Sequence, residues 1–420
     1  MRAIPQLQQC LAVEYKRTGK ETDIDCNGII DGNPESISKY KQWNFTLIER
    51  IEEEIAKSSD RCATLKSIFQ FIDKPLSSEE REYPLAYGVI VHKNAVQILF
   101  ELSAFYHPQN EYCIAVSETA EKYVLEFMLS VEKCFPNVHV LQRPKIEWGK
   151  FEILNSTITC LKSLLQTGTK WRYFQYLSGI DAPMKTNLET VQILKQLNDT
   201  VNIYVDPFQR YRIGIRNETE PPLPLFKSPL SLLLPRRTAE ELLSSPLTQE
   251  VLDFLVPTGI SDESFWGTML GNPAKFNVTG SFNASEMIEF DQKFNETDPQ
   301  AYSDYTNASF AMNGYIARYQ LWRKRQCKGM LINDSCVFGV EDLALLLKQH
   351  YLVAHKFYIN YQPAAYFCLL KEIFNRTHSP APFDTSIYAE IPLVEISRGV
   401  AISNLTHPEW FLKLHEWEYT

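Results

Sequence analysis

The sequence predicts an α/β fold in which a mostly parallel sheet is flanked by helices. Segments with strand-like and helix-like patterns alternate from residue 86 to residue 178, which is typical of a parallel sheet covered by helices. The hydrophobic content of 45% in 420 residues is ample for a sizeable core. Because such sheets bind ligands beyond the carboxyl ends of their strands, we expect the functional site at that edge.

Four short apolar runs are expected to form the parallel strands, and the amphipathic segments between them the helices. After the first strand the chain reads VHKNAV, without the glycine-rich turn of dinucleotide-binding folds, and the P-loop motif G-x-x-x-x-G-K-[ST] does not occur. Any nucleotide must therefore be held by other means. In order, the expected elements are strand 86–93, helix 95–106, strand 112–116, helix 118–133, strand 138–141, helix 152–165 and strand 173–178.

The flanking regions are less regular. Residues 1–80 are polar and are expected to form a stem that packs on the main domain, residues 81–420, with a helical stretch at 43–56. Residues 221–229 form a proline-rich connection, 230–235 a short buried strand, and 271–310 an exposed insert. A last helix is expected at 341–352, with three leucines on one face.

Composition bears on the partners and on the compartment. The 42 basic and 51 acidic residues give a net charge of -9, so nucleic acid is not an expected partner. Nine cysteines occur without a C-x-x-C pair, which favours disulfides over zinc sites. Eleven sequons indicate maturation in the endoplasmic reticulum. They begin at Asn44, Asn155, Asn198, Asn217, Asn277, Asn283, Asn295, Asn307, Asn333, Asn375 and Asn404.

The first twenty residues contain neither a secretory apolar region nor the roughly 20 apolar residues of a membrane anchor. The sequons and cysteines nevertheless favour a lumenal protein. We therefore expect that an anchor is missing upstream of this sequence.

Group transfer from a nucleotide donor would need a base and positive charge for the departing diphosphate. Glu263, in the segment SDESFW, is a candidate base, although an acidic residue at a helix N-terminus is also favoured by the helix dipole. Candidate cations are Lys356, the cluster 323–325, and the pair Arg210 and Arg212, any of which could instead be a solvated surface charge. The lone Asp-x-Asp, at 23–25, lies ahead of the sheet, so no metal site is expected.

Several longer segments together carry a family resemblance. They are IDCNGII (24–30), PLSSEEREYPLAYGVIVHK (75–93), HPQNEYCIAV (107–116), YLSGIDAPMKTN (176–187), SDESFW (261–266), IARYQLW (316–322), SCVFGVEDL and QHYLVAHKF. In order and spacing the chain resembles the core 2 and I-branching β-1,6-N-acetylglucosaminyltransferases, which are relatives of the peptide O-xylosyltransferases. The resemblance implies a GT-A-like nucleotide-sugar-binding fold with an N-terminal stem and a catalytic domain over 81–420.

The resemblance also implies an activity. It is the inverting, metal-independent transfer of GlcNAc from UDP-GlcNAc to O-glycans of glycoproteins, in β-1,6 linkage. The enzyme would be a type II membrane-anchored protein of the Golgi lumen and would need no cofactor. Two alternatives stay open: a transferase that uses another UDP-sugar, such as UDP-glucose or UDP-xylose, and a catalytically weak glycan-binding relative.

Aligned with the family's motifs, Glu263 would be the catalytic base and Lys356 would neutralise the leaving diphosphate. Ile90, Ser117 and Trp148 would line the uridine pocket. The acceptor would be bordered by Trp322, Arg210 and Arg212. The implied disulfides are Cys26–Cys368, Cys62–Cys134, Cys113–Cys160 and Cys327–Cys336, with Cys10 unpaired.

The sequence departs from the family's pattern at three places. Asn333 stands where the family has a second diphosphate-binding arginine, and Ser117 where it has a uridine-contacting aspartate. After Phe226 the chain reads KSPLS in place of a Ser-Gly-Ser segment. Because of these changes, the resemblance does not fix the identity of the donor sugar.

Overall fold

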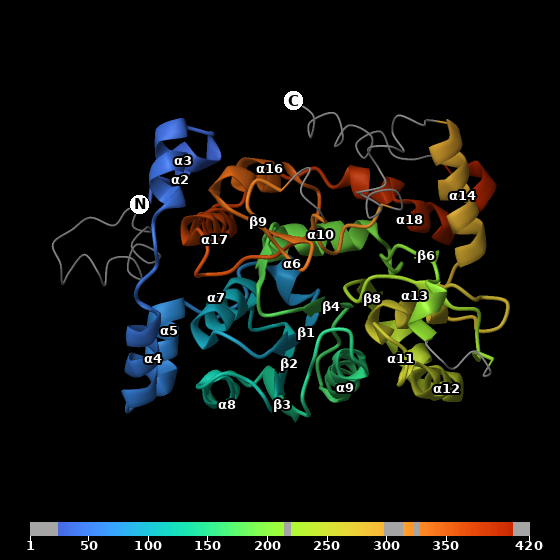
Figure 1. Ribbon diagram of the computed structural model, residues 1–420, viewed down its shortest axis with the longest axis horizontal. Coiled ribbons are helices and arrows are strands. Elements are labelled where there is room, and N and C mark those ends of the chain that lie inside the picture. The colour runs from blue at the N-terminus through green and yellow to red at the C-terminus, as the bar shows by residue number, and fades with distance from the viewer. Residues whose placement is uncertain (1–23, 214–219, 298–313, 323–326, 406–420) are drawn as a thin grey trace.

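The computed structural model describes residues 24–213, 220–297, 314–322 and 327–405 and is built around one five-stranded sheet (Figure 1). The strand order is β3-β2-β1-β4-β8. The first four strands are parallel, and β8 runs antiparallel to β4. This arrangement confirms the predicted mostly parallel sheet. The bounds are β1 (Ala86–Val91), β2 (Glu111–Ser117), β3 (Val138–Arg143), β4 (Tyr173–Leu177) and β8 (Leu233–Pro235).

Helices cover both faces of the sheet, because the side chains of its central strands alternate between two cores. In β2, Tyr112, Ile114 and Val116 belong to one core, whereas Cys113 and Ala115 belong to the other. The first core contains α7 (Ala95–Phe105), α8 (Val124–Cys134), α10 (Asn187–Gln196) and α17 (Pro363–His378). The second contains α9 (Phe151–Gln166), α11 (Arg236–Ser244), α12 (Pro246–Leu255) and α13 (Phe265–Leu270).

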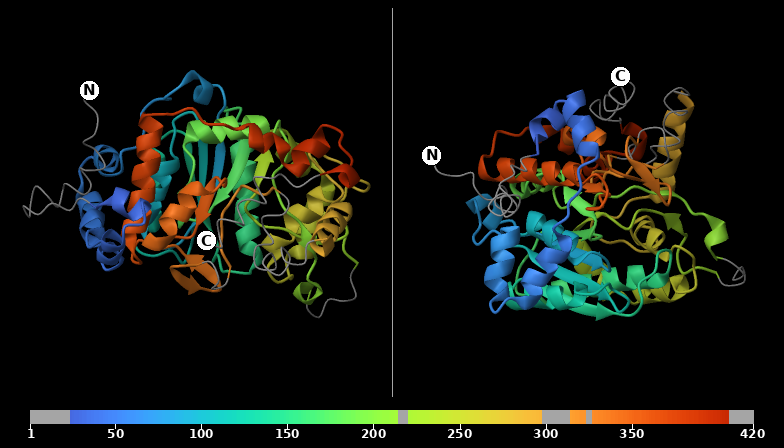
Figure 2. Two further views of the ribbon diagram at one scale, coloured as in Figure 1. Left: turned by 90° about the horizontal axis from the view of Figure 1, so that it is seen from above. Right: turned by 60° about the vertical axis from the view of Figure 1, so that its left-hand side comes forward.

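The N-terminal region is more ordered than the sequence predicted. Instead of one helical stretch it forms α2 (Cys26–Ile30), α3 (Pro34–Lys41), α4 (Ile48–Lys57), α5 (Arg61–Phe69) and α6 (Ser78–Arg81). Ile55 and Leu65 are fully buried in the core that α7 and α17 share. In Figure 1, α4 and α5 lie beside α7 and α8, whereas α2 and α3 lie near α16 (Leu343–Lys348) and α17. The short α6 lies against α10, so residues 24–81 pack directly on the sheet domain (Figures 1 and 2).

Four disulfides are present with the pairing that the resemblance implies. Cys26–Cys368 joins α2 to α17, and Cys62–Cys134 joins α5 to α8. The other two are Cys113–Cys160, between β2 and α9, and Cys327–Cys336. Cys10 lies outside the described residues.

The second half of the chain adds short strand pairs to the sheet domain. These are β5 (Asp181–Pro183) with β11 (Val353–His355), β6 (Asp206–Pro207) with β7 (Phe226–Lys227), and β9 (Met330–Ile332) with β10 (Ser335–Val337). The longest additional helix here is α14 (Ala284–Thr297). The short ones are η1 (Arg210–Ile213), η2 (Ser261–Glu263), η3 (Val340–Asp342), α16 (Leu343–Lys348), η4 (Ser386–Glu390), α18 (Pro392–Ser397) and η5 (Ile402–Asn404).

Two predictions for this half need correction. Residues 298–310 of the predicted insert lie outside the described part of the chain. The described part, 271–297, is not simply exposed, because Phe282, Ala284 and Met287 are buried in the core that also contains α11. The helix expected at 341–352 is shorter, because Gln349 is already extended and the chain enters β11 at Val353.

Most sequons within the described residues are exposed at the acceptor asparagine. Asn155 and Asn283 are half-buried, and Asn155 also donates a 2.9 Å hydrogen bond to Glu152 within α9. Asn217 and Asn307, and the side chain of Asn295, lie outside the described part of the chain. The exposed asparagines are Asn44, Asn198, Asn277, Asn333, Asn375 and Asn404.

Among the helices formed by the described residues, none has the length and apolar character needed to cross a membrane.

Candidate active site

The carboxyl ends of β1 to β3 carry the three residues expected to bind the donor nucleotide. Ile90 is the next-to-last residue of β1, and Ser117 is the last residue of β2. Trp148 follows β3 and is 74% exposed. The buried Ser117 hydroxyl accepts a 3.1 Å hydrogen bond from the backbone N–H of Ile146. Ser117 therefore holds the loop that carries Trp148.

Glu263 ends the short helix η2, directly before α13. Its backbone N–H donates to the carbonyl of Ile260, a residue in the left-handed conformation (φ 51°), and its carbonyl accepts from the N–H of Ser228 at 2.8 Å. The hydroxyl of Ser228 in turn accepts from the N–H of Gly267. These bonds fix the backbone of Glu263, while 28% of its side chain stays open to solvent.

The carboxylate of Glu263 is paired with Arg212. Arg212 Nη2 lies 2.6 Å from Glu263 Oε2, and only 3% of the arginine side chain is exposed. Arg212 also donates to Gln209 Oε1 (2.8 Å) and to the carbonyl of Ile260 (3.3 Å). A planar guanidinium held at three points orients its carboxylate partner.

The two arginines expected at the acceptor have different environments. Arg210 is exposed, as a residue that meets a ligand from solvent would be. Arg212 is buried beneath Glu263, so its role in this arrangement is to position the carboxylate. Direct contact of either arginine with an acceptor stays a prediction.

Asp262 is a second carboxyl group that the sequence reasoning did not single out. Burial, and secondarily the charge of Glu263, raises the pKa of Asp262 to about 7. Its Oδ1 is shielded from solvent and makes no hydrogen bond to any residue that the structure describes. Two adjacent carboxyls in different environments are a common mark of functional sites. The sequence offered only their adjacency, which a helix start also explains.

Lys356 lies beyond the carboxyl end of β4, directly after β11. The next residue, Phe357, donates its backbone N–H to the carbonyl of Ile180 at 2.9 Å. Burial lowers the pKa of Lys356, and its Nζ donates a 2.9 Å hydrogen bond to the carbonyl of Ile332. Asn333, which replaces the family's arginine, follows Ile332 at the exposed tip of the β9–β10 hairpin.

A buried ionic cluster supports the segment that leads to Lys356. Asp181 accepts from His355 Nδ1 and Arg318 Nη2, each at 2.7 Å, and its backbone N–H donates to Glu101 at 3.0 Å. Burial alone would raise the pKa of Asp181, but Arg318 and His355 lower it overall. Burial, and then the charge of Asp181, raises the pKa of Glu101 well above its usual value. Because these partners are 80 to 174 residues apart, no local pattern reveals the cluster.

Trp322 lies on the same side of the fold as Lys356. Its backbone forms a bridge with Ser335 of β10, and the next strand residue, Cys336, bonds to the carbonyl of Leu321. Trp322 is half-buried, and its contact with an acceptor stays a prediction. The basic cluster 323–325 lies outside the described residues.

Within the described ranges, no three His, Cys, Asp or Glu side chains are grouped closely enough to hold a metal ion. Of the Asp-x-Asp sequence, Asp23 lies outside the described residues. Asp25 caps α2 by accepting from the N–H of Gly28 and also bonds to Ser36.

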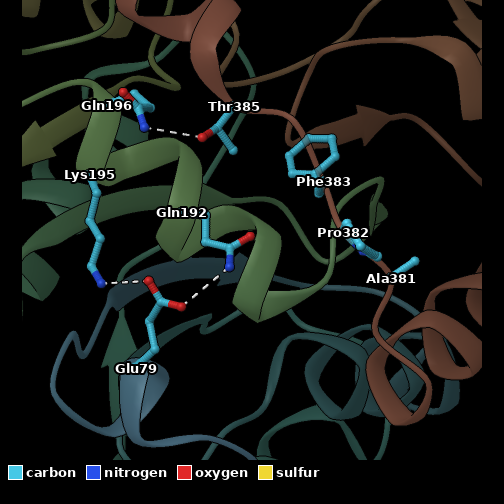
Figure 3. A pocket seen from close by; sticks show the side chains of 8 residues that line it. All are labelled: Glu79, Gln192, Lys195, Gln196, Ala381, Pro382, Phe383 and Thr385. Carbon is cyan, nitrogen blue, oxygen red and sulfur yellow. Dashed lines mark hydrogen bonds and ion pairs between the residues drawn. The ribbon is translucent and has the colours of Figure 1, made fainter.

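A cavity of about 410 Å³ lies elsewhere, between α6, α10 and residues 381–385 (Figure 3). Lys195 and Glu79 form a 2.6 Å ion pair at its wall. Lys195 also lies over the ring of Tyr83, which precedes β1. The cavity is therefore near the amino ends of the strands and is separate from Glu263 and Lys356.

The chain is similar to proteins of one known family. Residues 85–312 match the family model described as "Branch: Core-2/I-Branching enzyme". A human "Beta-1,3-galactosyl-O-glycosyl-glycoprotein beta-1,6-N-acetylglucosaminyltransferase" is 27% identical over 390 residues, covering 87% of this chain and 88% of that protein. A human protein of the same description, numbered 3, is 25% identical and covers 84% of this chain and 83% of its own length. The corresponding sheep protein is 26% identical with the same coverage.

One comparison with a solved structure is weaker. A putative glucose-1-phosphate thymidylyltransferase from Bacillus anthracis covers 40% of this chain and 80% of its own, at 10% identity and a TM-score of 0.22. A similarity this low carries no argument about the fold or the function.

Proposed function

Because the chain belongs to the Core-2/I-branching enzyme family and is a glycosyltransferase, we propose that it transfers GlcNAc from UDP-GlcNAc to O-glycans of glycoproteins, in β-1,6 linkage and without a metal ion. One observation carries this proposal. It is the partly exposed carboxylate of Glu263, held by the buried Arg212 at the edge of the sheet where a ligand is expected.

The proposed chemistry is a single displacement. Arg212 holds Glu263 Oε2, which leaves the other carboxylate oxygen to take the proton from the C6 hydroxyl of the acceptor sugar. The hydroxyl oxygen then forms a bond to the anomeric carbon as the bond from that carbon to the UDP oxygen breaks. The products are the β-linked glycan and UDP, with inversion at the anomeric carbon.

Lys356 is proposed to neutralise the departing diphosphate. A lysine ammonium has three N–H donors, and the structure uses one of them for the carbonyl of Ile332. The other two are available for phosphate oxygens, and the burial of Lys356 strengthens such a contact. The neutral Asn333 cannot supply a second charge, so Lys356 would act here without the arginine that the family pattern places beside it.

The test of this function is a transfer assay with protein secreted from a eukaryotic host. A core 1 O-glycan is offered with UDP-GlcNAc, UDP-glucose or UDP-xylose, in EDTA or in Mn²⁺, and the product linkage is determined by NMR. We expect GlcNAc on a C6 hydroxyl, with equal rates in EDTA and Mn²⁺. Transfer from another donor would move the specificity, and an Mn²⁺ requirement would contradict the role of Lys356. A folded protein that binds UDP but transfers nothing would favour the weak glycan-binding relative.

Two variants test whether Glu263 is the base in this reaction. Glu263→Gln keeps the shape of the side chain and removes its basicity, so we expect a loss of about 10²–10⁴-fold in kcat with UDP affinity unchanged. Glu250→Gln is the matched control, because Glu250 is an exposed glutamate on α12. Undiminished turnover by Glu263→Gln would remove Glu263 from the mechanism.

We also propose that the protein works in the Golgi lumen as a type II membrane protein. Four disulfides and six exposed sequon asparagines support the lumenal side of this proposal. Expression of the full gene product in cultured cells, followed by glycosidase digestion and imaging, tests it. Complete resistance to N-glycosidase, with a diffuse cytosolic signal, would contradict it.

A further inference from the structure

Two aromatic side chains are unusually exposed. Trp148 is 74% exposed and Tyr211 is 73% exposed, whereas the other exposed large hydrophobic side chains in the described part of the chain reach at most 51%. Most tyrosines and tryptophans that the structure describes are buried or half-buried. An aromatic ring that is left open to water beside a functional site is a candidate contact surface for a ligand.

The residues that follow Trp148 and Tyr211 are hydrogen-bonded through their backbones to the segment that leads into Glu263. The N–H of Gly259 donates to the carbonyl of Arg212, which follows Tyr211 (2.8 Å). The N–H of Ile260 donates to the carbonyl of Gly149, which follows Trp148 (2.9 Å). Each ring is therefore one residue away from a backbone contact to the loop that leads into Glu263.

Tyr211 has the firmer connection to the carboxylate. Its hydroxyl donates to Gln209 Oε1 at 2.9 Å, and the same oxygen accepts from Arg212 Nε at 2.8 Å. Arg212 in turn binds Glu263. The hydroxyl of Tyr211 is thus tied to the group that orients the carboxylate, while the faces of its ring stay open to solvent. A contact surface fixed in this way loses little conformational entropy when a ligand binds.

The geometry points to Tyr211 as a platform for the acceptor glycan, on which a neutral sugar ring stacks through its C–H face. The inference rests on the proposed function, because it takes Glu263 as the base that the acceptor must reach. A pyranose ring presents apolar C–H bonds on its faces and hydroxyls at its edge, which suits an aromatic face beside a carboxylate. Glu263 and Arg212 neutralise each other, so this pair adds no net charge beside the ring of Tyr211.

The experiment is a steady-state analysis with the methyl glycoside of Galβ1-3GalNAc as the acceptor and UDP-GlcNAc as the donor. For Tyr211→Ala we expect the acceptor KM to rise at least tenfold, with kcat and the donor KM within twofold of wild type. Tyr211→Phe retains the ring and should keep the acceptor KM within threefold. Leu76→Ala is the control, because it removes an exposed hydrophobic side chain (39% exposed) ahead of α6, near the amino ends of the strands.

Two results would overturn the platform. One is an acceptor KM for Tyr211→Ala within twofold of wild type. The other is an equal loss in Tyr211→Phe and Tyr211→Ala, because the hydroxyl and its bond to Gln209 would then matter and the ring face would not. Matching melting temperatures of the variants exclude misfolding as the cause of a raised KM.

A binding measurement separates this inference from the proposed function. Saturation-transfer NMR of the same disaccharide, on wild type, Glu263→Gln and Tyr211→Ala, requires no turnover. Binding that Glu263→Gln retains and Tyr211→Ala loses supports the platform, even if no donor is transferred. If the wild-type enzyme transfers the sugar and Tyr211→Ala binds the disaccharide as well as wild type does, the proposed function stands. The role of Tyr211 as a platform is then contradicted.

Discussion

Replacing Arg212 with methionine tests whether the buried arginine holds the carboxylate of Glu263, the proposed base. Methionine keeps much of the apolar volume and removes the guanidinium. The change breaks the 2.6 Å contact to Glu263 and the hydrogen bonds to Gln209 and the carbonyl of Ile260. Glu263 is 28% exposed and can regain water, so the free-energy loss is smaller than for a fully buried pair.

The expected loss of stability follows from these contacts. A hydrogen bond to a charged group contributes about 1.5–3 kcal/mol, and we expect Arg212→Met to lose about 2–3 kcal/mol in total. With an unfolding entropy of about 2.1 cal/mol/K per residue, a chain of 420 residues loses about 1 °C in Tm for each kcal/mol. The expected shift is therefore about 2–3 °C.

A double-mutant cycle isolates the pair. Thermal unfolding is followed by tryptophan fluorescence for wild type, Arg212→Met, Glu263→Gln and the double variant. Because each single variant already breaks the charge pair, the double variant should lose about 1–2 °C less than the two single losses added together. Arg212→Lys, which keeps the charge but not the planar fork, should fall between wild type and Arg212→Met.

The same variant should lose activity without losing the donor. A base that is free to change rotamer is less often in the productive position, so kcat for Arg212→Met should fall about 10- to 100-fold, with UDP affinity unchanged. Additive Tm losses in the cycle, together with unchanged kcat, would show that the contact between Arg212 and Glu263 does not position the base.

Two further predictions concern buried basic side chains. Lys356→Met should raise the donor KM and lower kcat, and Lys356→Arg should recover part of both. Because burial lowers the pKa of Lys356, wild-type activity should also decline as the pH rises, at a pH below the ordinary lysine pKa of about 10.5. An unchanged donor KM would contradict the role in the leaving group. Burial, and secondarily the charge of His378, lowers the pKa of His107 to about 3. Below about pH 6.5 the imidazole is therefore protonated in the unfolded chain but stays neutral in the folded chain. Stability from His107 is therefore present above pH 6.5 and should fall by about 1.4 kcal/mol per pH unit below it, and His107→Gln should show a shallower decline in Tm between pH 6.5 and 5. Parallel Tm curves would refute this.

The sheet could be predicted from the sequence because its strands are short, largely apolar runs that alternate with helical segments. The predicted strands match β1, β2, β3 and β4 to within two residues. The helix expected from residue 118 begins only at Val124 in the structure. Hydrogen bonds from Ala120 to Ser117 and from Glu121 to His92 hold the intervening residues in a turn. Such contacts depend on neighbouring strands, and helical periodicity does not reveal them.

The helical stretch expected at 43–56 corresponds to α4, but the other N-terminal helices were missed for a related reason. Helices as short as α2 and α6 have little intrinsic stability, so packing and capping determine whether they form. Cys26 and Cys62 fasten this region to helices more than 70 residues further along the chain. The amino-acid pattern within residues 24–81 does not contain that information.

The candidate site could be predicted only in part. Glu263 and Lys356 emerged from aligned motifs, and the structure places both beyond the carboxyl ends of the parallel strands. The pairing of Arg212 with Glu263 spans 51 residues, and no local sequence pattern reveals it. The pairing depends on burial of the arginine, which follows from the folding of residues 259–263 against η1.

The disulfide between Cys26 and Cys368 closes the polypeptide into a covalent ring of more than three hundred residues. The other three disulfides lie within this ring. A single proteolytic nick anywhere between these two cysteines opens the ring but does not release a fragment. Nicked protein therefore migrates as one full-mass species in a denaturing gel without reductant and separates into pieces when reductant is added. Cleavage in the exposed loops of a secreted preparation stays hidden until the thiols are reduced.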